Sequence, residues 1–401
     1  MSGLVPADQP PLAAARARGA DLIWLALPLL LLGLAAAWLY LADPLGSFNT
    51  GAPPVENLTF ERTILDDTGI RVLLRGGGSE PMMIAQVQVD DAYWQFTQDP
   101  AGEITRGSTA WVHVPFPWVV GEAHAVNVLT NTGATFEHEI AVAVSTPRPT
   151  SGLLVSQAMI GAFVGIFPIA IGLMFYPALR GVGQSGMNFL LALTIGLLAY
   201  LAVDTIEDAL ELVGEAAALF QGPVMVVLAA AASFVLLMAI GRRGGAAPAG
   251  VALATYIALG IGLHNLGEGL AIGAAFAAGA AGLGTFLVLG FTLHNITEGI
   301  GIAAPMLKVR PPLWIFAALT LLAGGPAIVG MWVGSLAYAP QWSALALAIG
   351  AGAILQVVVE VGAYLMRSND GRSGALYTPP VLAGLAVGAT FMYVTALFVK
   401  I

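Results

Sequence analysis

The sequence contains no cysteine. Disulfide bonds, thiolate metal sites and cysteine nucleophiles are therefore excluded. The side chains that remain to bind a transition metal are histidine, asparagine and the carboxylates. Histidine is itself scarce, with 5 residues in the chain, so a histidine inside an apolar segment is informative.

Charge is scarce as well. The 401 residues include 15 Lys and Arg and 24 Asp and Glu, which makes 10% charged, whereas an ordinary soluble protein has about 25%. Hydrophobic residues make up 58%, and the mean hydropathy is +0.83. A water-soluble fold cannot bury so much apolar surface, so we predict an integral membrane protein with the lipid bilayer as its surroundings. The net charge of −9 argues against a nucleic-acid partner.

Two segments precede the rest of the chain. We expect residues 1–21 to form a cytoplasmic tail. Residues 22–42 are an uncharged run of 21, long enough to span a bilayer, and we expect a retained transmembrane anchor there. Cleavage near Ala42, as in a signal peptide, is the alternative, although a signal peptide has a shorter apolar core.

Residues 50–148 have a different composition. They hold 17 charged residues, and short stretches of alternating apolar and polar residues are separated by Gly- and Pro-rich turns. This pattern predicts an all-β sandwich of about seven strands. Strands are expected within 70–75, 84–90, 92–96, 110–114, 124–130 and 136–144.

From residue 151 onward the chain is apolar again, and Tyr and Trp residues mark the ends of the apolar runs. We predict an α-helical polytopic membrane protein: an eight-span domain over 151–401, the N-terminal anchor, and the inserted β-sandwich domain at 50–148. The eight spans are expected at 152–178, 187–203, 222–241, 249–278, 283–307, 313–339, 343–366 and 379–399.

The distribution of Lys and Arg predicts the orientation. With the N-terminus inside, nine basic residues lie in cytoplasmic segments, whereas the outside loops of the helical region and the C-terminus carry only Lys400. This positive-inside bias places the β-domain and the C-terminus outside the plasma membrane. The nine residues are Arg16, Arg18, Arg180, Arg242, Arg243, Lys308, Arg310, Arg367 and Arg372.

Three carboxylates lie inside the predicted spans, namely Glu268, Glu298 and Glu360. A charged group at this depth costs about 3 kcal/mol, so each needs a partner or a function. Two of them belong to near-copies of one motif, LHNLGEG at 263–269 and LHNITEG at 293–299. The copies are 30 residues apart, near the centres of consecutive spans.

The spacing within each motif predicts a metal site. His and Glu at positions i and i+4 share one face of a helix, so two facing antiparallel helices bring two imidazoles and two carboxylates together. Such a set suits Zn(II), and also Fe(II), Mn(II), Co(II), Ni(II) or Cd(II). The carbonyl oxygens of the two motif asparagines could join an adjacent second position. The alternative is that the histidines only make interhelical hydrogen bonds. The expected ligands are His264, Glu268, His294, Glu298, Asn265 and Asn295.

Paired HNxxEG motifs on the fourth and fifth of eight spans resemble the ZIP (Zrt/Irt-like) family of divalent-metal transporters. The resemblance covers about 150–401 and excludes the anchor and the β-domain. It implies eight spans with both ends outside. It also implies a primary site of the two motif histidines and two motif glutamates, with the asparagines and glutamates lining a second site.

The sequence departs from the family pattern at two places. Members often have Pro before the motif Glu, where this chain has Gly267 and Thr297. Many also place a Glu on the sixth span, whereas the stretch at 324–330 reads GGPAIVG. We therefore expect one strong metal position, or a weakened pair.

Two further groups could lie on an ion path. Asp204, Asp208 and Glu211 share a helical face after the second span and could concentrate cations at an outside entrance. A solvated helix end is the alternative. Gln356 and Glu360 on the seventh span could lie on the cytoplasmic exit path. The alternative is that Glu360 reaches toward Arg367 and water.

These observations predict a transporter that moves a divalent transition metal, Zn(II) foremost, toward the cytoplasm by alternating access. The metal is the substrate rather than a resident cofactor, and its binding should weaken as the pH falls because the ligands must be deprotonated. A homodimer and an extracytoplasmic partner of the β-domain are further expectations. We predict no enzyme, since neither motif has a spare acid or base beside it. The alternative function is a non-transporting metal sensor or scaffold with the β-domain as its output.

Overall fold

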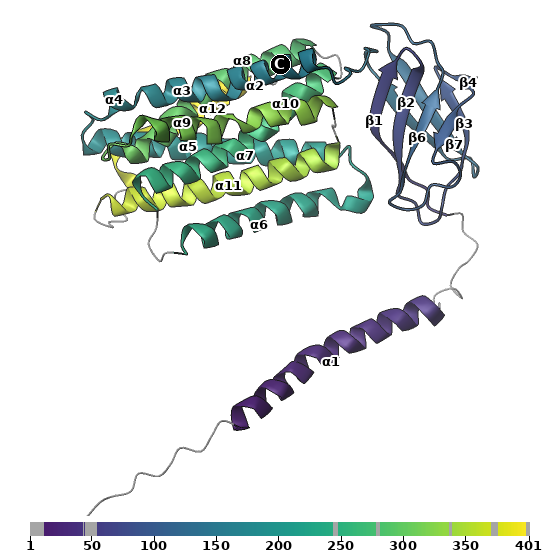
Figure 1. Ribbon diagram of the computed structural model, residues 1–401, viewed down its shortest axis with the longest axis horizontal. Coiled ribbons are helices and arrows are strands. Elements are labelled where there is room, and N and C mark those ends of the chain that lie inside the picture. The colour runs from purple at the N-terminus through teal and green to yellow at the C-terminus, as the bar shows by residue number, and fades with distance from the viewer. Residues whose placement is uncertain are drawn as a thin grey trace, which may run out of the picture. The chain divides into compact units, whose positions relative to one another are not determined.

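The computed structural model describes residues 12–42, 44, 54–243, 248–277, 281–336, 339–369 and 376–397. The chain divides into two compact units, Met1–Pro54 and Val55–Ile401. In the first unit, the structure describes the helix α1. The second contains the β-domain, defined here as residues 58–140, and the helical bundle, defined as residues 151–397 (Figure 1).

The helix α1 (Leu12–Ala42) includes the whole run expected to be an anchor, and it begins inside the segment expected to be a tail. Its apolar part Ala26–Ala42 is shorter than the other candidate spans. Large side chains along it are exposed, among them Leu29 at 67% and Trp38 at 59%. The anchor therefore stays a prediction.

The β-domain consists of two four-stranded antiparallel sheets that share one apolar core (Figure 1). The strand order is β1-β2-β6-β5 in one sheet and β4-β3-β7-β8 in the other. The strands are β1 (Leu58–Asp66), β2 (Gly69–Gly76), β3 (Ile84–Val89), β4 (Ala92–Trp94), β5 (Thr97–Asp99), β6 (Thr109–Val114), β7 (His124–Thr130) and β8 (Thr135–Ile140).

The alternation of side chains accounts for these strands. In β6, Ala110, Val112 and Val114 are buried while the residues between them are half-buried, as expected of a sheet with one face on the core. The stretch expected at 92–96 ends at Trp94, and β5 follows in the other sheet. The strand expected at 136–144 ends at Ile140, while β1 and β5 add to the predicted set.

The bundle contains eight helices that are long and apolar enough to cross a membrane, among the described residues. Seven of them agree with the predicted spans, whereas the second helix, expected at 187–203, runs from Gln184 to Leu212 and includes the acidic residues expected after the span. This architecture is that of a multi-pass membrane protein. Its elements are α2 (Ser151–Gly161), η2 (Ala162–Ile166), α3 (Phe167–Met174), α4 (Tyr176–Leu179), α5 (Gln184–Leu212), η3 (Ala218–Phe220), α6 (Gly222–Gly241), α7 (Gly250–Ala277), α8 (Ala281–Ala303), η4 (Ala304–Met306), α9 (Leu313–Gly324), α10 (Pro326–Leu336), α11 (Pro340–Arg367) and α12 (Pro379–Leu397).

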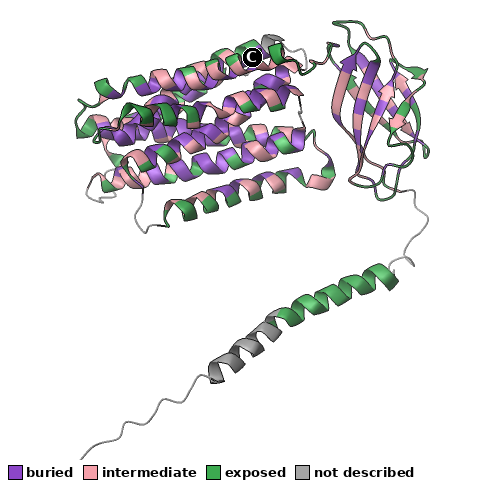
Figure 2. Ribbon diagram, viewed as in Figure 1, coloured by how far each residue is buried: buried purple, intermediate pink, exposed green. Residues whose placement is uncertain are grey.

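The helices differ in burial. In the most apolar 18 residues of α11, 67% of the residues are buried, and in the corresponding stretch of α7 56% are buried. In the span that contains α6, only 11% are buried. Figure 2 shows the same contrast, with buried residues concentrated on α7 and α11 and exposed ones along α6. An apolar helix with an exposed face suits a hydrocarbon solvent and would be unfavourable in water. α7 and α11 thus form the interior, and α6 lies at the periphery.

The first and sixth spans are interrupted near their middles. In the first span, the π-helix η2 lies between α2 and α3, just before Pro168. In the sixth span, α9 ends at Gly324 and α10 begins at Pro326. Proline has no N–H to donate and crowds the preceding turn, which accounts for both breaks. The two breaks touch, because a Cβ added to Gly165 would lie 2.3 Å from the carbonyl oxygen of Gly324.

Glycines bring α10 close to α7. A Cβ added to Gly269 would meet the carbonyl oxygen of Ala327 at 2.2 Å, and one added to Gly330 would meet that of Leu266 at 2.1 Å. On the other side, Gly299 of α8 and Gly172 of α3 approach each other in the same way. Small residues of this kind let membrane helices pack backbone to backbone.

The β-domain contacts the bundle through three side chains of β1 and β2. Arg62 donates from Nη2 to the carbonyl oxygen of Leu336 at 2.5 Å, and Gln341 Nε2 donates to Glu61 Oε1 at 3.1 Å. Arg75 holds Glu61 through Nε and Nη2 at 2.5 and 3.0 Å, and its guanidinium lies over the ring of Phe220. The sheet is thereby attached to the end of α10, the start of α11 and η3.

Candidate metal centre

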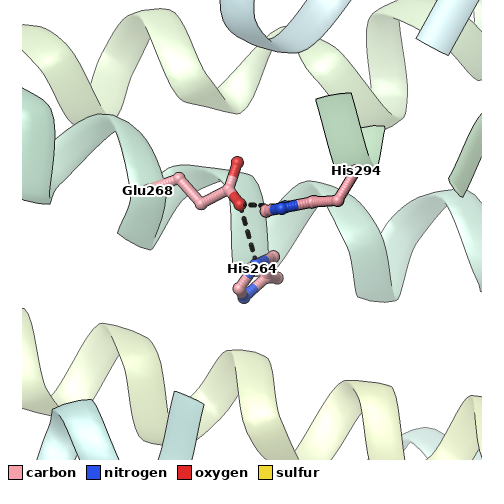
Figure 3. A group of neighbouring side chains, drawn as sticks. All are labelled: His264, Glu268 and His294. Atoms are coloured by element: carbon pink, nitrogen blue, oxygen red, sulfur yellow. Dashed lines mark hydrogen bonds and ion pairs between the residues drawn. The ribbon is translucent and has the colours of Figure 1, made fainter. Parts of the chain in front are cut away.

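Three side chains from the two motifs converge in the bundle interior. His264 and Glu268 come from the middle of α7, and His294 comes from the middle of α8. Glu268 Oε1 lies 3.1 Å from Nε2 of His264 and 2.5 Å from Nε2 of His294 (Figure 3). One ligand atom from each residue lies within 4.8 Å of the others, and all three side chains are buried. Two imidazole nitrogens and one carboxylate oxygen at this spacing form a group that could hold a metal ion.

The helical spacing expected from the sequence produces this geometry. His264 and Glu268 are four residues apart on one helix, so they share a face. α7 and α8 are consecutive and pack side by side, which places His294 opposite that face. Both helices continue through Gly267 and Thr297 without a break, and Thr297 Oγ1 donates to the carbonyl oxygen of His294 at 2.6 Å.

The motif asparagines are held at the two helix breaks. Asn265 Nδ2 donates to the carbonyl oxygen of Ala323 at 3.0 Å, at the end of α9. Asn295 Nδ2 donates to the carbonyl oxygen of Val164 at 3.1 Å, inside η2. Both carbonyls lie where the i→i+4 pattern is interrupted, at Pro168 for Val164 and at the end of α9 for Ala323. Asn295 Nδ2 also donates to Glu268 Oε2 at 3.1 Å and so links the asparagine to the cluster.

This arrangement leaves buried oxygen atoms without donors. Oδ1 of Asn265, Oδ1 of Asn295 and both carboxylate oxygens of Glu298 have no hydrogen-bond partner among the described residues. All four atoms accept hydrogen bonds and donate none when the carboxyl group is ionised. Buried polar atoms are almost always paired, so unpaired acceptors on the two motif helices call for a cation, a proton or water.

Glu298 lies outside the group formed by the other three expected ligands. It is 3% exposed and lines a small cavity that also contains Thr194 and Thr297. The rest of that cavity is apolar, lined by Leu197, Leu198, Leu201, Ile261, Gly301 and Met392. The structure thus brings together His264, Glu268 and His294, while Glu298, Asn265 and Asn295 stay predicted ligands.

Thr205 contacts the candidate site and carries no signal in the sequence motif. Its hydroxyl lies 3.0 Å from Nδ1 of His264, and the residue is 1% exposed on α5. The sequence offers one hint, because Thr205 lies between the acidic residues Asp204 and Asp208. The carbonyls of Val164 and Ala323 likewise could not be identified from the sequence, because only the packing of the helix breaks places them at the asparagines.

The acidic residues expected at an entrance lie on either side of Thr205 on α5. Asp204 and Asp208 are half-buried and Glu211 is exposed. Since Asp204 directly precedes Thr205, this segment passes close to His264 at one point. The acidic segment is therefore adjacent to the candidate metal centre, and its role as an entrance stays a prediction.

The residues expected on an exit path are buried in α11. Glu360 is 0% exposed, and its Oε1 accepts from Nε of Arg242 at 3.0 Å. Glu360 Oε2 and both amide atoms of Gln356 have no partner among the described residues. The alternative in which Glu360 reaches Arg367 and water is wrong, because Arg367 donates instead to the carbonyl oxygen of Pro248.

The histidines of the β-domain have other partners. Nδ1 of His124 lies 2.7 Å from Asp90 Oδ2, and Nε2 of His113 lies 3.0 Å from the carbonyl oxygen of Thr68. The ring of His138 stacks on that of Phe60, and its Nε2 lies at hydrogen-bond distance, 2.9 Å, from Oγ1 of Thr63. Burial lowers the pKa of this imidazole. Among the described residues, the one group of His and carboxylate side chains with metal-ligand spacing is in the bundle.

Comparison with known protein families and with curated proteins finds no match to this chain. The family suggested by the paired motifs is therefore a proposal that rests on the motifs and on the geometry above.

Proposed function

We propose that this chain is a ZIP-like transporter of divalent transition-metal ions, with Zn(II) as the foremost substrate. The observation that carries the proposal is the convergence of His264, Glu268 and His294 in the bundle interior, one ligand atom from each within 4.8 Å of the others. Nitrogen and oxygen ligands in this combination suit Zn(II) and its neighbours in the first transition series.

Two features support transport over a purely structural role of the motifs. Hydrogen bonds between helices would pair the buried polar atoms, yet four acceptor oxygens of Asn265, Asn295 and Glu298 have no partner among the described residues. The site also lies against the breaks in the first and sixth spans. Interrupted helices beside a binding site at membrane depth are typical of proteins that work by alternating access.

In the proposed mechanism an ion enters from the outside and exchanges water for the imidazole and carboxylate ligands. It then leaves toward the cytoplasm past Gln356 and Glu360. The acidic segment around Asp204 would raise the local cation concentration at the entrance. The expected orientation puts the β-domain outside. Its contacts with Phe220 and Gln341 fall in loops expected outside, and Leu336 lies near the outer end of the expected sixth span, which supports that topology.

Uptake into liposomes tests the proposal. The purified full chain is reconstituted with an internal zinc indicator, and we expect a saturable flux of Zn(II). Substituting both His264→Ala and His294→Ala should abolish the flux, because two of the three converging ligand atoms are lost. His113→Ala is the control, since this histidine lies in the β-domain and bonds a backbone carbonyl.

Binding measured on the same preparations separates transport from the alternative function. Tight binding of Zn(II) without flux would contradict transport and favour a metal sensor or scaffold. The attachment of the β-domain to the end of α10 and the start of α11 is the observation in favour of that alternative, since it gives a route for a signal. If the double variant keeps both Zn(II) binding and flux, the proposed metal site at His264 and His294 is contradicted.

A further inference from the structure

Thr205 makes two contacts with its single hydroxyl group. Oγ1 donates to the carbonyl oxygen of Leu201 at 2.7 Å, one turn back on α5. The same atom lies 3.0 Å from Nδ1 of His264 on α7. The residue is 1% exposed, so both contacts are shielded from water.

These two contacts fix the direction of each hydrogen bond. A carbonyl oxygen cannot donate, so the hydroxyl hydrogen of Thr205 points at Leu201. The hydroxyl oxygen can then only accept from His264, so Nδ1 of His264 carries a proton. Nε2 is the nitrogen that faces Glu268, at 3.1 Å. Without a metal ion Nε2 donates to the Glu268 carboxylate, so a metal ion would replace the Nε2 proton while the Nδ1 proton stays hydrogen-bonded to the Thr205 hydroxyl.

We propose that Thr205 is a positioning residue that holds His264 in the tautomer and ring orientation required for metal binding. The inference rests on the proposed function, because it concerns the metal site described above. A metal-bound histidine usually donates its other ring N–H to a neighbouring acceptor, and loss of that acceptor lowers metal affinity about 10–100-fold. Here a hydroxyl supplied by a third helix, α5, serves as the acceptor.

A threonine bonded to the carbonyl four residues earlier is common in helices and needs no function by itself. Thr320 in α9 shows this local pattern, with Oγ1 donating to the carbonyl oxygen of Phe316 at 2.9 Å. Thr320 is 8% exposed and does not belong to the candidate site. It is therefore a matched control for the loss of a buried threonine hydroxyl.

Zinc affinity of the full chain in detergent is measured by competition with a chromophoric chelator. We expect Thr205→Val to weaken Zn(II) binding about 10–100-fold, as is usual when the hydrogen-bond acceptor of a metal-binding histidine is lost. Thr205→Ser keeps the hydroxyl and should restore most of the affinity, and Thr320→Val should leave it unchanged. Equal affinity of the wild type and Thr205→Val would overturn the inference. If Thr205→Val does not fold, Thr205→Ala replaces it in the same comparison.

A spectroscopic measurement on the metal-free protein separates this inference from the proposed function. In chain labelled with nitrogen-15 histidine, we expect a downfield Nδ1–H resonance of His264 in the wild type and in Thr205→Ser. The resonance should move upfield in Thr205→Val. A His264 that carries no proton on Nδ1 would overturn the inference even if zinc binds. If the wild type binds no zinc, the proposed function fails while this spectrum still tests the hydrogen bond.

Discussion

Glu298 places a carboxyl group in an apolar cavity. Leu197, Ile261 and Met392 are among the side chains around it, and neither carboxylate oxygen has a partner among the described residues. A buried polar group without a hydrogen bond costs about 1–3 kcal/mol of stability. Proteins retain such groups where function requires them, because activity and stability can oppose each other at a site.

Removal of this carboxyl group should stabilise the metal-free protein. We expect Glu298→Leu to raise the free energy of unfolding by about 1–3 kcal/mol, since the unpaired acceptor is replaced by a side chain that suits the cavity. The measurement is thermal unfolding in detergent with a chelator present. Zinc affinity of the same variant should fall if Glu298 completes the metal site when the ion binds.

Glu360→Leu is the control for this substitution. Glu360 is equally buried, but its Oε1 is paired with Arg242 at 3.0 Å. The same change should therefore raise the melting temperature less than Glu298→Leu does, because it also removes the ion pair with Arg242, whose side chain is 47% exposed. A melting temperature of Glu298→Leu below that of the wild type would contradict the prediction.

At the scale of the elements, the contact between α7 and α10 determines how the candidate site is supported. Gly330 of α10 and Gly269 of α7 leave no room for a Cβ between the two backbones. α7 carries His264 and Glu268, so a wider separation of the two helices would also displace the site. Close packing of this kind responds strongly to added volume.

A single methyl group placed between the helices should be destabilising. In Gly330→Ala the new Cβ would lie 2.1 Å from the carbonyl oxygen of Leu266 and 2.8 Å from the backbone nitrogen of Leu270. Backbone atoms cannot move aside as a side chain can, so we expect a loss of about 1–3 kcal/mol of stability. Thermal unfolding in detergent measures this loss.

Gly362→Ala on α11 is the matched control. Nothing lies within 4 Å of a Cβ at this position. Alanine there should be neutral or stabilise the helix by about 0.5–1 kcal/mol, because glycine loses more backbone entropy on folding. Equal stabilities of Gly330→Ala and Gly362→Ala would show that the helices are not packed as described.

At the scale of the whole molecule, the buried carboxylate of Glu61 links the β-domain to the bundle. Glu61 is 5% exposed and accepts from Arg75 within the sheet and from Gln341 at the start of α11. Removal of one member of a buried pair usually leaves an uncompensated charge and costs about 3–5 kcal/mol. Glu61→Ala should therefore lower the unfolding free energy of the full chain by about that amount.

Asp67→Ala is the comparison for that variant. Asp67 pairs with Arg148 in the same region of the chain, but the two side chains are 80% and 67% exposed. An exposed pair contributes about 0–1 kcal/mol, so this variant should unfold close to the wild type. Chemical unfolding followed by tryptophan fluorescence measures both. A Glu61→Ala variant as stable as Asp67→Ala would contradict a buried contact between the β-domain and the bundle.

Much of this molecule could be predicted from local patterns. The eight spans follow from long apolar runs with few charges, and most of the strands follow from alternation at period two. The pairing of His264 with Glu268 follows from their spacing of four residues on one helix. Boundaries were less predictable, since the strand expected at 92–96 ends at Trp94 and β8 ends at Ile140.

The partners of the buried polar groups could not be predicted. Glu360 pairs with Arg242, which is 118 residues away in sequence, and Thr205 meets His264 at a separation of 59 residues. Such contacts depend on how helices pack, and a pattern within one helix contains no information about its neighbours. The same holds for Glu298, which repeats the spacing of Glu268 but lies outside the group that Glu268 forms with the two histidines.

The sequence by itself determined the class of the protein, the positions of its spans and the two motifs, because hydropathy and helical periodicity are local properties of the chain. Tertiary structure alone decided which ligands converge, which carbonyls hold the asparagines and which hydroxyl meets His264. The physical reason is that buried polar atoms must find partners or ions in three dimensions, and only the packing of distant helices sets which partners are within reach.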